Sequence, residues 1–454
     1  MEQLQCLNGL ILTGEERQKR IVRWTEKESQ MSAFDKVIGY EPIKEELMQI
    51  CDMIQNREVY EKLGARLPQG ILLHGGPGVG KTLMARCFVE ESGLESYVLR
   101  RNRGSGDFIK HIADTFEKAR ENQPCVVVMD DMDKFANEDS SHQDAEEYIA
   151  VQACIDEVRD SGVTVIATVN DIDKLPGSLV RTGRFDRRIL VSRPAEDEAE
   201  AIITHYLSDK PVDSSVNMED LTKMIRYRSC AELETILNES AISAASARKE
   251  RIEMDDLLKA VLRLQYGTTE AVRDRSDEKM RKVALHEAGH LVAAEVLYEG
   301  SIGLASIRPV GYGDGCGFVN RCSVIYRRPH VVMVYLAGKA AVEMYYSEAV
   351  ASGCGEDLKN AAEVIEEGIM ESGTLGLHLI SSGRSSSMPD AYRAQIRAGI
   401  ASEMEKLMLQ TRELLLNNRE FLEKAAEQLL KKETLLYSEI RAIRESCATG
   451  NVAC

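Results

Sequence analysis

The sequence predicts an α/β domain built on a parallel sheet, followed by a small helical region and a mainly α-helical domain. Three observations support this. From Phe34 to about Pro194, apolar runs of strand length alternate with helical segments, as in a parallel sheet covered on both faces. Residues 195–267 are charged with helical periodicity, and helical patterns dominate again from 268 to 454. At 454 residues, the chain has room for roughly three domains.

The composition excludes several classes of protein. With 57 Lys+Arg against 74 Asp+Glu, the net charge of −17 argues against a nucleic-acid partner or an anionic-membrane surface. The 11 cysteines are odd in number and form no C-x-x-C pair, as expected of thiols in a reducing compartment. No apolar run approaches the roughly 18 to 20 residues of a membrane helix. We therefore expect a cytoplasmic protein without membrane insertion. Residues 1–33 are expected to form a helical lead segment.

The first strong strand, residues 70–74, runs into a glycine-rich loop and then a helix. The loop reads G-x-x-x-x-G-K-T, the signature of a P-loop in its required strand–loop–helix context. Its backbone N–H groups can surround a polyphosphate, while Lys81 pairs with the outer phosphates and Thr82 binds Mg²⁺. The predicted nucleotide contacts are Gly75, Gly76, Pro77, Gly78, Val79, Gly80, Lys81, Thr82 and Leu83.

Two later strands end in polar side chains. One ends in Asp130, which we assign to Mg²⁺, and Asp131, which we assign to polarising the attacking water. The other ends in Asn170, an amide that could sense the γ-phosphate. Arg181 and Arg184 lie in a short turn from which arginines can reach a neighbouring subunit's nucleotide, although single arginines are more often solvated surface cations.

A second motif, H-E-x-x-H, lies in the helical stretch 283–297. His286 and His290 are four residues apart, so both imidazoles can reach one zinc ion, and Glu287 could take a proton from an activated water. Only 8 histidines occur in the chain, so chance placement is improbable. A catalytic zinc also needs a third protein ligand. The residues alone leave Glu343, Glu356 and Asp357 as candidates.

Together these motifs resemble the FtsH-type ATP-dependent zinc metalloproteases, AAA+ proteins that form hexameric rings. The resemblance covers about residues 34–445 and implies three domains. These are an α/β AAA+ P-loop domain over residues 34–194, its helical lid over residues 195–267, and a mainly α-helical zinc metalloprotease domain over residues 268–454. The implied ligands are ATP, Mg²⁺ and Zn²⁺, and the implied partners are polypeptide substrates and further copies of the chain in a homo-hexamer.

The resemblance also assigns individual residues. It places Ile38 and Gly39 in the adenine pocket, and His205, in the lid, facing the nucleotide. It makes Asn170 the sensor residue, and Arg181 and Arg184 the arginine fingers that act in trans. Among the acidic candidates it selects Asp357 as the third zinc ligand, because residues 352–362 match the family's motif for that ligand.

Three features depart from the family pattern. We expect no membrane-spanning N-terminal part, which the family usually has. The water-polarising residue, usually Glu, is Asp131. The segment 100–108, which should grip polypeptide in the ring pore, is short, and Phe108 is its only aromatic residue. Phe108 could grip substrate or pack the helix that follows, and the basic run Arg100, Arg101 and Arg103 could select acidic segments.

These observations lead to one main hypothesis and two alternatives. The main hypothesis is an ATP-dependent zinc endopeptidase. The first alternative is a zinc peptidase whose ATPase is weak or regulatory, because Asp131 and residues 100–108 are atypical. The second is a non-proteolytic AAA+ remodeller with a structural zinc site, against which Glu287 argues, since a structural site needs no general base.

Overall fold

The computed structural model describes residues 32–102, 104–137, 145–181, 183–268, 278–309, 316–323, 325, 327–346, 354–372 and 390–448. Most of the lead segment predicted over residues 1–33 lies outside these residues. The chain divides into two compact units, Met1–Pro194 with Ser229–Ala231, and Ala195–Arg228 with Glu232–Cys454. The predicted lid therefore groups mostly with the second unit.

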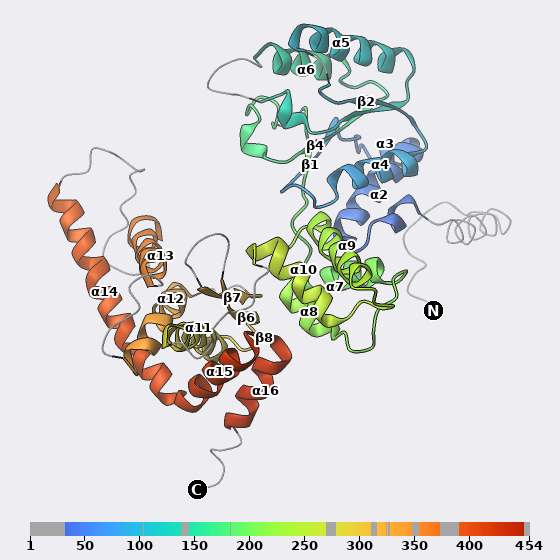
Figure 1. Cartoon of the computed structure of the whole chain (residues 1–454). Coiled ribbons are helices and arrows are strands. Elements are labelled where there is room, and N and C mark those ends of the chain that lie inside the picture. Colours follow the sequence, from blue (N-terminus) through green and yellow to red (C-terminus); the bar gives the residue numbers. More distant parts are fainter. Residues whose placement is uncertain are drawn as a thin grey trace, which may run out of the picture. The chain divides into compact units, whose positions relative to one another are not determined.

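The first unit is built on a five-stranded sheet in which every strand pairs in parallel with its neighbours (Figure 1). The strand order is β2-β3-β4-β1-β5, which confirms the predicted α/β fold. β3 and β4 are buried at every residue, as expected of central strands covered on both faces. The strands are β1 (Gly70–His74), β2 (Glu95–Leu99), β3 (Cys125–Met129), β4 (Val163–Val169) and β5 (Arg187–Leu190).

Helices cover both faces of this sheet (Figure 1). α5 packs on α6, β2 and β3, whereas α4 packs on β1, β4 and α2. Phe108, at the start of α5, is fully buried edge-to-face against Phe135, so it packs the helix. The helices are η1 (Ala33–Lys36), α2 (Glu41–Gln55), α3 (Arg57–Glu61), α4 (Lys81–Ser92), α5 (Ser105–Glu121), η2 (Met132–Lys134), α6 (Ala145–Glu157) and η3 (Ile172–Lys174).

The second unit begins with four helices in the region predicted to be the lid. Their apolar faces supply buried residues such as Ile203, Leu221, Leu233 and Leu257. α10 ends at Tyr266, and the next residue, Gly267, has a left-handed φ of 62° that suits glycine at a helix C-terminus. The lid helices are α7 (Glu196–Leu207), α8 (Met218–Met224), α9 (Cys230–Ser246) and α10 (Met254–Tyr266).

The rest of the second unit surrounds one buried helix, α11 (Glu278–Leu297). It packs against α12, α15 and a three-stranded antiparallel sheet of order β7-β6-β8 (Figure 1). β6 and β7, which follow α11 in the chain, pair antiparallel, and β7 is an edge strand. The elements are β6 (Ile302–Pro309), β7 (Cys316–Arg321), α12 (Arg328–Glu343), α13 (Cys354–Glu367), η4 (Gly368–Ser372), α14 (Asp390–Asn417), α15 (Arg419–Lys432), β8 (Thr434–Leu436) and α16 (Tyr437–Ala448).

Candidate functional site

Two helices bring three metal-binding side chains together in the second unit. His286 and His290 lie one turn apart on α11, with their Nε2 atoms 3.0 Å apart. Oδ2 of Asp357, from α13, lies 3.2 Å from both Nε2 atoms. Two imidazoles and one carboxylate that converge in this way match the donor set of a catalytic zinc site, which keeps one position open for water.

The other two acidic candidates do not join this cluster. Glu343 forms ion pairs with Lys339 (2.5 Å) and with Arg412 (2.5 Å), so its charge is already compensated. Glu356 is exposed. Of the described residues, the only group of three or more His, Cys, Asp or Glu side chains with metal-ligand spacing is His286, His290 and Asp357.

Helix α12 packs against the two histidines and orients their rings. The Val334 carbonyl oxygen lies 2.6 Å from Nδ1 of His290, so Nδ1–H donates there and Nε2 keeps its lone pair for a metal. One turn later, a Cβ on Gly338 would lie 2.5 Å from His286 Cε1 and from His290 Nε2. Glycine is therefore required at residue 338, and this requirement was not predicted from the sequence.

Glu287 is buried beside the ligands and lies beneath the edge strand β7. A Cβ on Gly317, whose φ is 92°, would lie 2.4 Å from Oε1 of Glu287. Burial raises the pKa of Glu287 to about 8, which suits a base that must hold a proton transiently. Burial also opposes ionisation of Asp357, but the two histidine side chains beside it outweigh burial and lower the pKa of Asp357.

In the first unit, the P-loop follows β1, and its conformation depends on glycine. Gly75, Gly78 and Gly80 have φ of 148°, 76° and 100°, values that other residues rarely adopt. A Cβ on Gly75 would also lie 2.0 Å from the Val191 carbonyl oxygen. The loop therefore needs glycine both for its curvature and for its close approach to the chain after β5.

The polar residues at the carboxyl ends of the strands meet at this loop. Lys81 Nζ donates to the carbonyl oxygens of Gly75 and Gly76, both at 2.7 Å, and to Asn170 Oδ1 at 2.8 Å. Thr82 Oγ1 donates to Asp130 Oδ1 at 2.8 Å, the pairing expected of two Mg²⁺-binding groups. Burial lowers the pKa of Lys81, and nearby carboxylates oppose that shift.

Two features of this site were not predicted from the sequence. The Arg100 guanidinium forms an ion pair with Asp130 Oδ2, so it contacts the predicted Mg²⁺ ligand. Asp131 is held by Lys134 Nζ at 2.6 Å and by Asn170 Nδ2 at 3.1 Å. The contacts of Arg100 with Asp130 and of Asn170 with Asp131 join residues far apart in the sequence, which no local motif reveals, whereas Lys134 lies only three residues after Asp131.

The remaining nucleotide-site predictions have different structural settings. Arg181 is exposed, whereas Arg184 is buried and donates to both carboxylate oxygens of Asp156, at 2.9 and 2.7 Å. Ile38 and Gly39 lie between η1 and α2 and are half-buried. His205 is exposed on α7, in the second unit. The roles of these five residues stay predictions.

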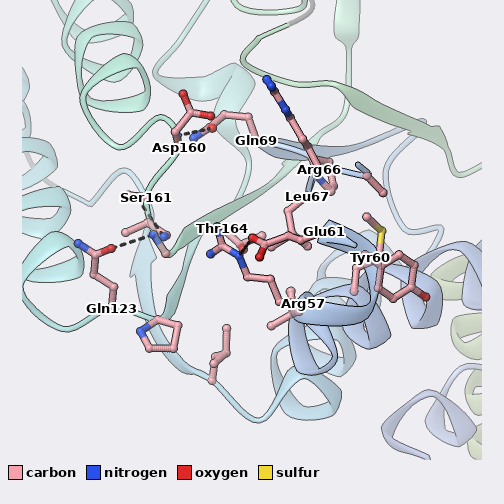
Figure 2. Close-up of a pocket in the computed structure, with 18 of the residues that line it drawn as sticks. Arg57, Tyr60, Glu61, Arg66, Leu67, Gln69, Gln123, Asp160, Ser161 and Thr164 are labelled. Atoms are coloured by element: carbon pink, nitrogen blue, oxygen red, sulfur yellow. Dashed lines mark hydrogen bonds and ion pairs between the residues drawn. The ribbon is translucent and has the colours of Figure 1, made fainter. Parts of the chain in front are cut away.

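A cavity of about 780 Å³ lies at the opposite end of the first unit's sheet (Figure 2). Its lining includes Gln69, Gln123 and Ser161, which precede β1, β3 and β4. Open parallel sheets bind ligands at the carboxyl ends of their strands. The cavity is therefore not part of the nucleotide site.

Comparisons with known proteins agree with both sites. Residues 71–193 match the ATPase family associated with various cellular activities (AAA), and residues 273–443 match peptidase family M41. The ATP-dependent zinc metalloprotease FtsH 1 of Thermomicrobium roseum is 31% identical over 441 residues, covering 90% of this chain and 68% of the relative. The chain belongs to the FtsH family. It thus carries an AAA ATPase domain and an M41 metallopeptidase domain.

Other FtsH relatives give the same result. The ATP-dependent zinc metalloprotease FtsH of Bacillus subtilis is 29% identical, over 92% of this chain and 70% of the relative. That of Leptotrichia buccalis is 31% identical, over 90% of this chain and 56% of the relative. Within the part of the chain that the structure describes, no helix is both long and apolar enough to cross a membrane.

Proposed function

We propose that this protein is an ATP-dependent zinc endopeptidase that works as a homo-hexameric ring and delivers polypeptides to its peptidase sites. The observation that carries the proposal is the convergence of His286, His290 and Asp357 beside the buried Glu287, in a chain that also holds a complete P-loop. A purely structural metal site would have no use for a buried carboxylate next to its ligands.

At the peptidase site, Nε2 of His286, Nε2 of His290 and a carboxylate oxygen of Asp357 would hold the zinc ion. When bound, zinc supplies a Lewis acid that polarises water and the peptide carbonyl. The Glu287 carboxylate accepts a proton from the attacking water and passes it to the leaving amine nitrogen. The low-polarity setting that raises the pKa of Glu287 favours this transfer.

At the nucleotide site, Thr82 and Asp130 would hold Mg²⁺, and Lys81 would contact the outer phosphates of ATP. Asp131 orients the attacking water, and Asn170 senses the γ-phosphate through the side chain that now bonds Lys81. Arg181 and Arg184 act on the nucleotide of the neighbouring subunit, and Arg181 is the exposed member of the pair. For Arg184 this role requires release from Asp156.

A second candidate function, a zinc peptidase with a weak or regulatory ATPase, is favoured by two observations. Phe108, the only aromatic residue of segment 100–108, is fully buried and so does not offer its ring to a substrate. Arg100 is paired with Asp130, where Mg²⁺ would have to compete with it. Both features weaken the link between ATP turnover and movement of a polypeptide.

Digestion of casein by zinc-loaded protein, with and without ATP, separates these functions, with Glu287→Gln as the control variant. Cleavage that requires ATP and is lost in Glu287→Gln, with ATP hydrolysis retained, supports the proposal. Cleavage that is indifferent to ATP supports the second candidate. Absence of cleavage by the parent protein would mean that the chain is a non-proteolytic remodeller.

A further inference from the structure

Two lid helices hold the edge strand β7 of the peptidase domain. Asn320 of β7 donates through Nδ2 to the Met224 carbonyl oxygen at the end of α8 (3.2 Å) and to the Tyr266 hydroxyl at the end of α10 (2.5 Å). The Tyr266 ring also stacks on Phe318 of β7, with centroids 3.8 Å apart and planes inclined by 19°. The ends of the lid helices α8 and α10 therefore both contact the short strand β7.

The packing of α8 on the rest of the peptidase domain is equally close. A Cβ on Gly303 of β6 would lie 2.3 Å from the Lys223 carbonyl oxygen, so the backbones of β6 and α8 are in direct contact. Asp220 of α8 is buried and accepts hydrogen bonds from the Ser438 backbone N–H and hydroxyl, both at 2.7 Å. Movement of α8 must therefore displace the sheet that contains β7.

The strand that the lid holds is the one that lies on the catalytic carboxylate. Gly317 directly precedes Phe318, and a Cβ on it would lie 2.4 Å from Oε1 of Glu287. A shift of β7 by a fraction of that distance changes the space over Glu287. Because β7 is an edge strand, its outer face is also where an extended peptide can add to the sheet.

The lid is linked to the P-loop through residues 229–231, which group with the first unit. The Ala231 backbone N–H donates to the Gly78 carbonyl oxygen at 3.0 Å. A Cβ on Gly78 would lie 2.9 Å from Oγ of Ser229. Residues 229–231 follow α8 and begin α9, so a change in the P-loop acts on the same lid that grips β7.

We propose that Tyr266, Phe318 and Asn320 are positioning residues that transmit the nucleotide state of the P-loop to β7 and so change the peptidase site over Glu287. The proposal rests on the proposed peptidase function and goes beyond it. Nucleotide regulates cleavage itself, in addition to any delivery of substrate. A short unstructured peptide, which needs no unfolding, is then cleaved at rates that depend on the nucleotide.

The test compares zinc-loaded parent protein with Asn320→Ala and Tyr266→Phe. Cleavage of a fluorogenic unstructured peptide of about ten residues is measured with Mg²⁺ and either a non-hydrolysable ATP analogue or ADP. Typical couplings between sites change an equilibrium at least about fivefold, so we expect a ratio of about five or more between the two states of the parent. Asn320→Ala brings the ratio close to one. Tyr266→Phe, which keeps the ring stack but removes the hydroxyl, gives a smaller loss.

The matched control is Arg441→Ala, which removes an exposed ion pair (3.3 Å) between α16 and Glu219 of α8 without touching β7. This variant keeps the parent ratio. A parent ratio of one, or the same ratio in Asn320→Ala as in the parent, would overturn the proposal. If Asn320→Ala unfolds, the ratio in Tyr266→Phe decides.

A second measurement does not depend on peptidase activity. Hydrogen exchange of the β7 backbone amides, residues 317–321, is followed in the same two nucleotide states. The expected result is a nucleotide-dependent rate in the parent that is lost in Asn320→Ala and retained in Arg441→Ala. If the parent cleaves no peptide, the proposed function fails while this exchange pattern still supports the coupling. Nucleotide-independent exchange of β7 in the parent excludes the coupling.

Discussion

The nucleotide site and the peptidase site balance their charged groups in different ways. In the nucleotide site, Lys81 bonds Asn170 and two carbonyl oxygens, and Asp130 bonds Thr82 and Arg100, so protein partners compensate the charges. In the peptidase site, the metal-binding atoms of His286, His290 and Asp357 converge within 4.8 Å of one another. Their lone pairs repel unless a cation or proton lies between them. The first site can keep its shape without ligand, whereas the second is built for a metal.

We expect the largest effect for Glu287→Gln, which should inactivate the peptidase site and leave the nucleotide site unchanged. The amide keeps the size of the side chain but cannot accept the proton, so peptide cleavage should fall roughly 100- to 10,000-fold. ATP hydrolysis should be unchanged, because Glu287 belongs to the second compact unit and the P-loop to the first. Initial rates of both reactions on one preparation test this, with zinc content as the control. Retained cleavage would remove Glu287 from the mechanism.

A smaller effect, on metal binding, is expected for Gly338→Ala. The new Cβ would lie 2.5 Å from atoms of both proposed zinc ligands, His286 and His290, so at least one imidazole must turn away. Disturbing residues that orient metal ligands typically costs about 10- to 100-fold in affinity, which competition with a chromophoric chelator measures.

The matched control for this change is Gly355→Ala. Residue 355 lies in α13, close in sequence to Asp357, but no atom lies within 4 Å of a Cβ placed there. Zinc affinity should therefore stay at the parent value. Equal losses in the two variants would show that helix packing in general, and not the contact with the histidines, sets the affinity.

The parts of both sites whose positions follow from the sequence are those encoded by neighbouring residues. The P-loop is a continuous motif between a strand and a helix, and His286 and His290 are separated by one helical turn. The strand ends at Asp130 and Asn170 also follow from local pattern, because parallel strands bring their carboxyl ends to one edge.

The parts that required the structure depend on contacts between distant elements. The residues alone could not separate Asp357 from Glu343, because only the packing of α13 and α12 against α11 decides which carboxylate reaches the histidines. Gly338 and Gly317 are needed because of what approaches them, and a glycine in a sequence does not reveal its neighbours. The ion pair of Arg100 with Asp130 has the same origin.

In the nucleotide site, Asp131→Glu should have the next largest effect, on the rate of ATP hydrolysis. The Asp131 side chain is one methylene shorter than the Glu usual in the family, and Lys134 and Asn170 hold it back. A misplacement of about 1 Å can cost on the order of 100-fold in rate, so a longer side chain should raise the ATP hydrolysis rate, by about tenfold. Steady-state phosphate release measures it. An unchanged or lower rate would show that Asp131 is not the limiting feature.

The smallest expected effect is a displacement of the acid limb of the pH profile for peptide cleavage. Glu287 acts as a base only when ionised, and burial raises its pKa from 4.5 to about 8 in the protein without metal. A group with a raised pKa gains its proton as the pH falls through that higher value, so cleavage should be lost there. The charge of bound zinc lowers the pKa of a neighbouring carboxylate. The acid limb of the kcat/KM profile should therefore lie above pH 4.5 and below about 8.

Because the pKa of Asp357 is lowered, that carboxylate stays ionised throughout this range. Zinc content measured across the range separates proton uptake by Glu287 from metal loss, and a limb at or below pH 4.5 with zinc retained would mean that burial does not set the acidity of the base.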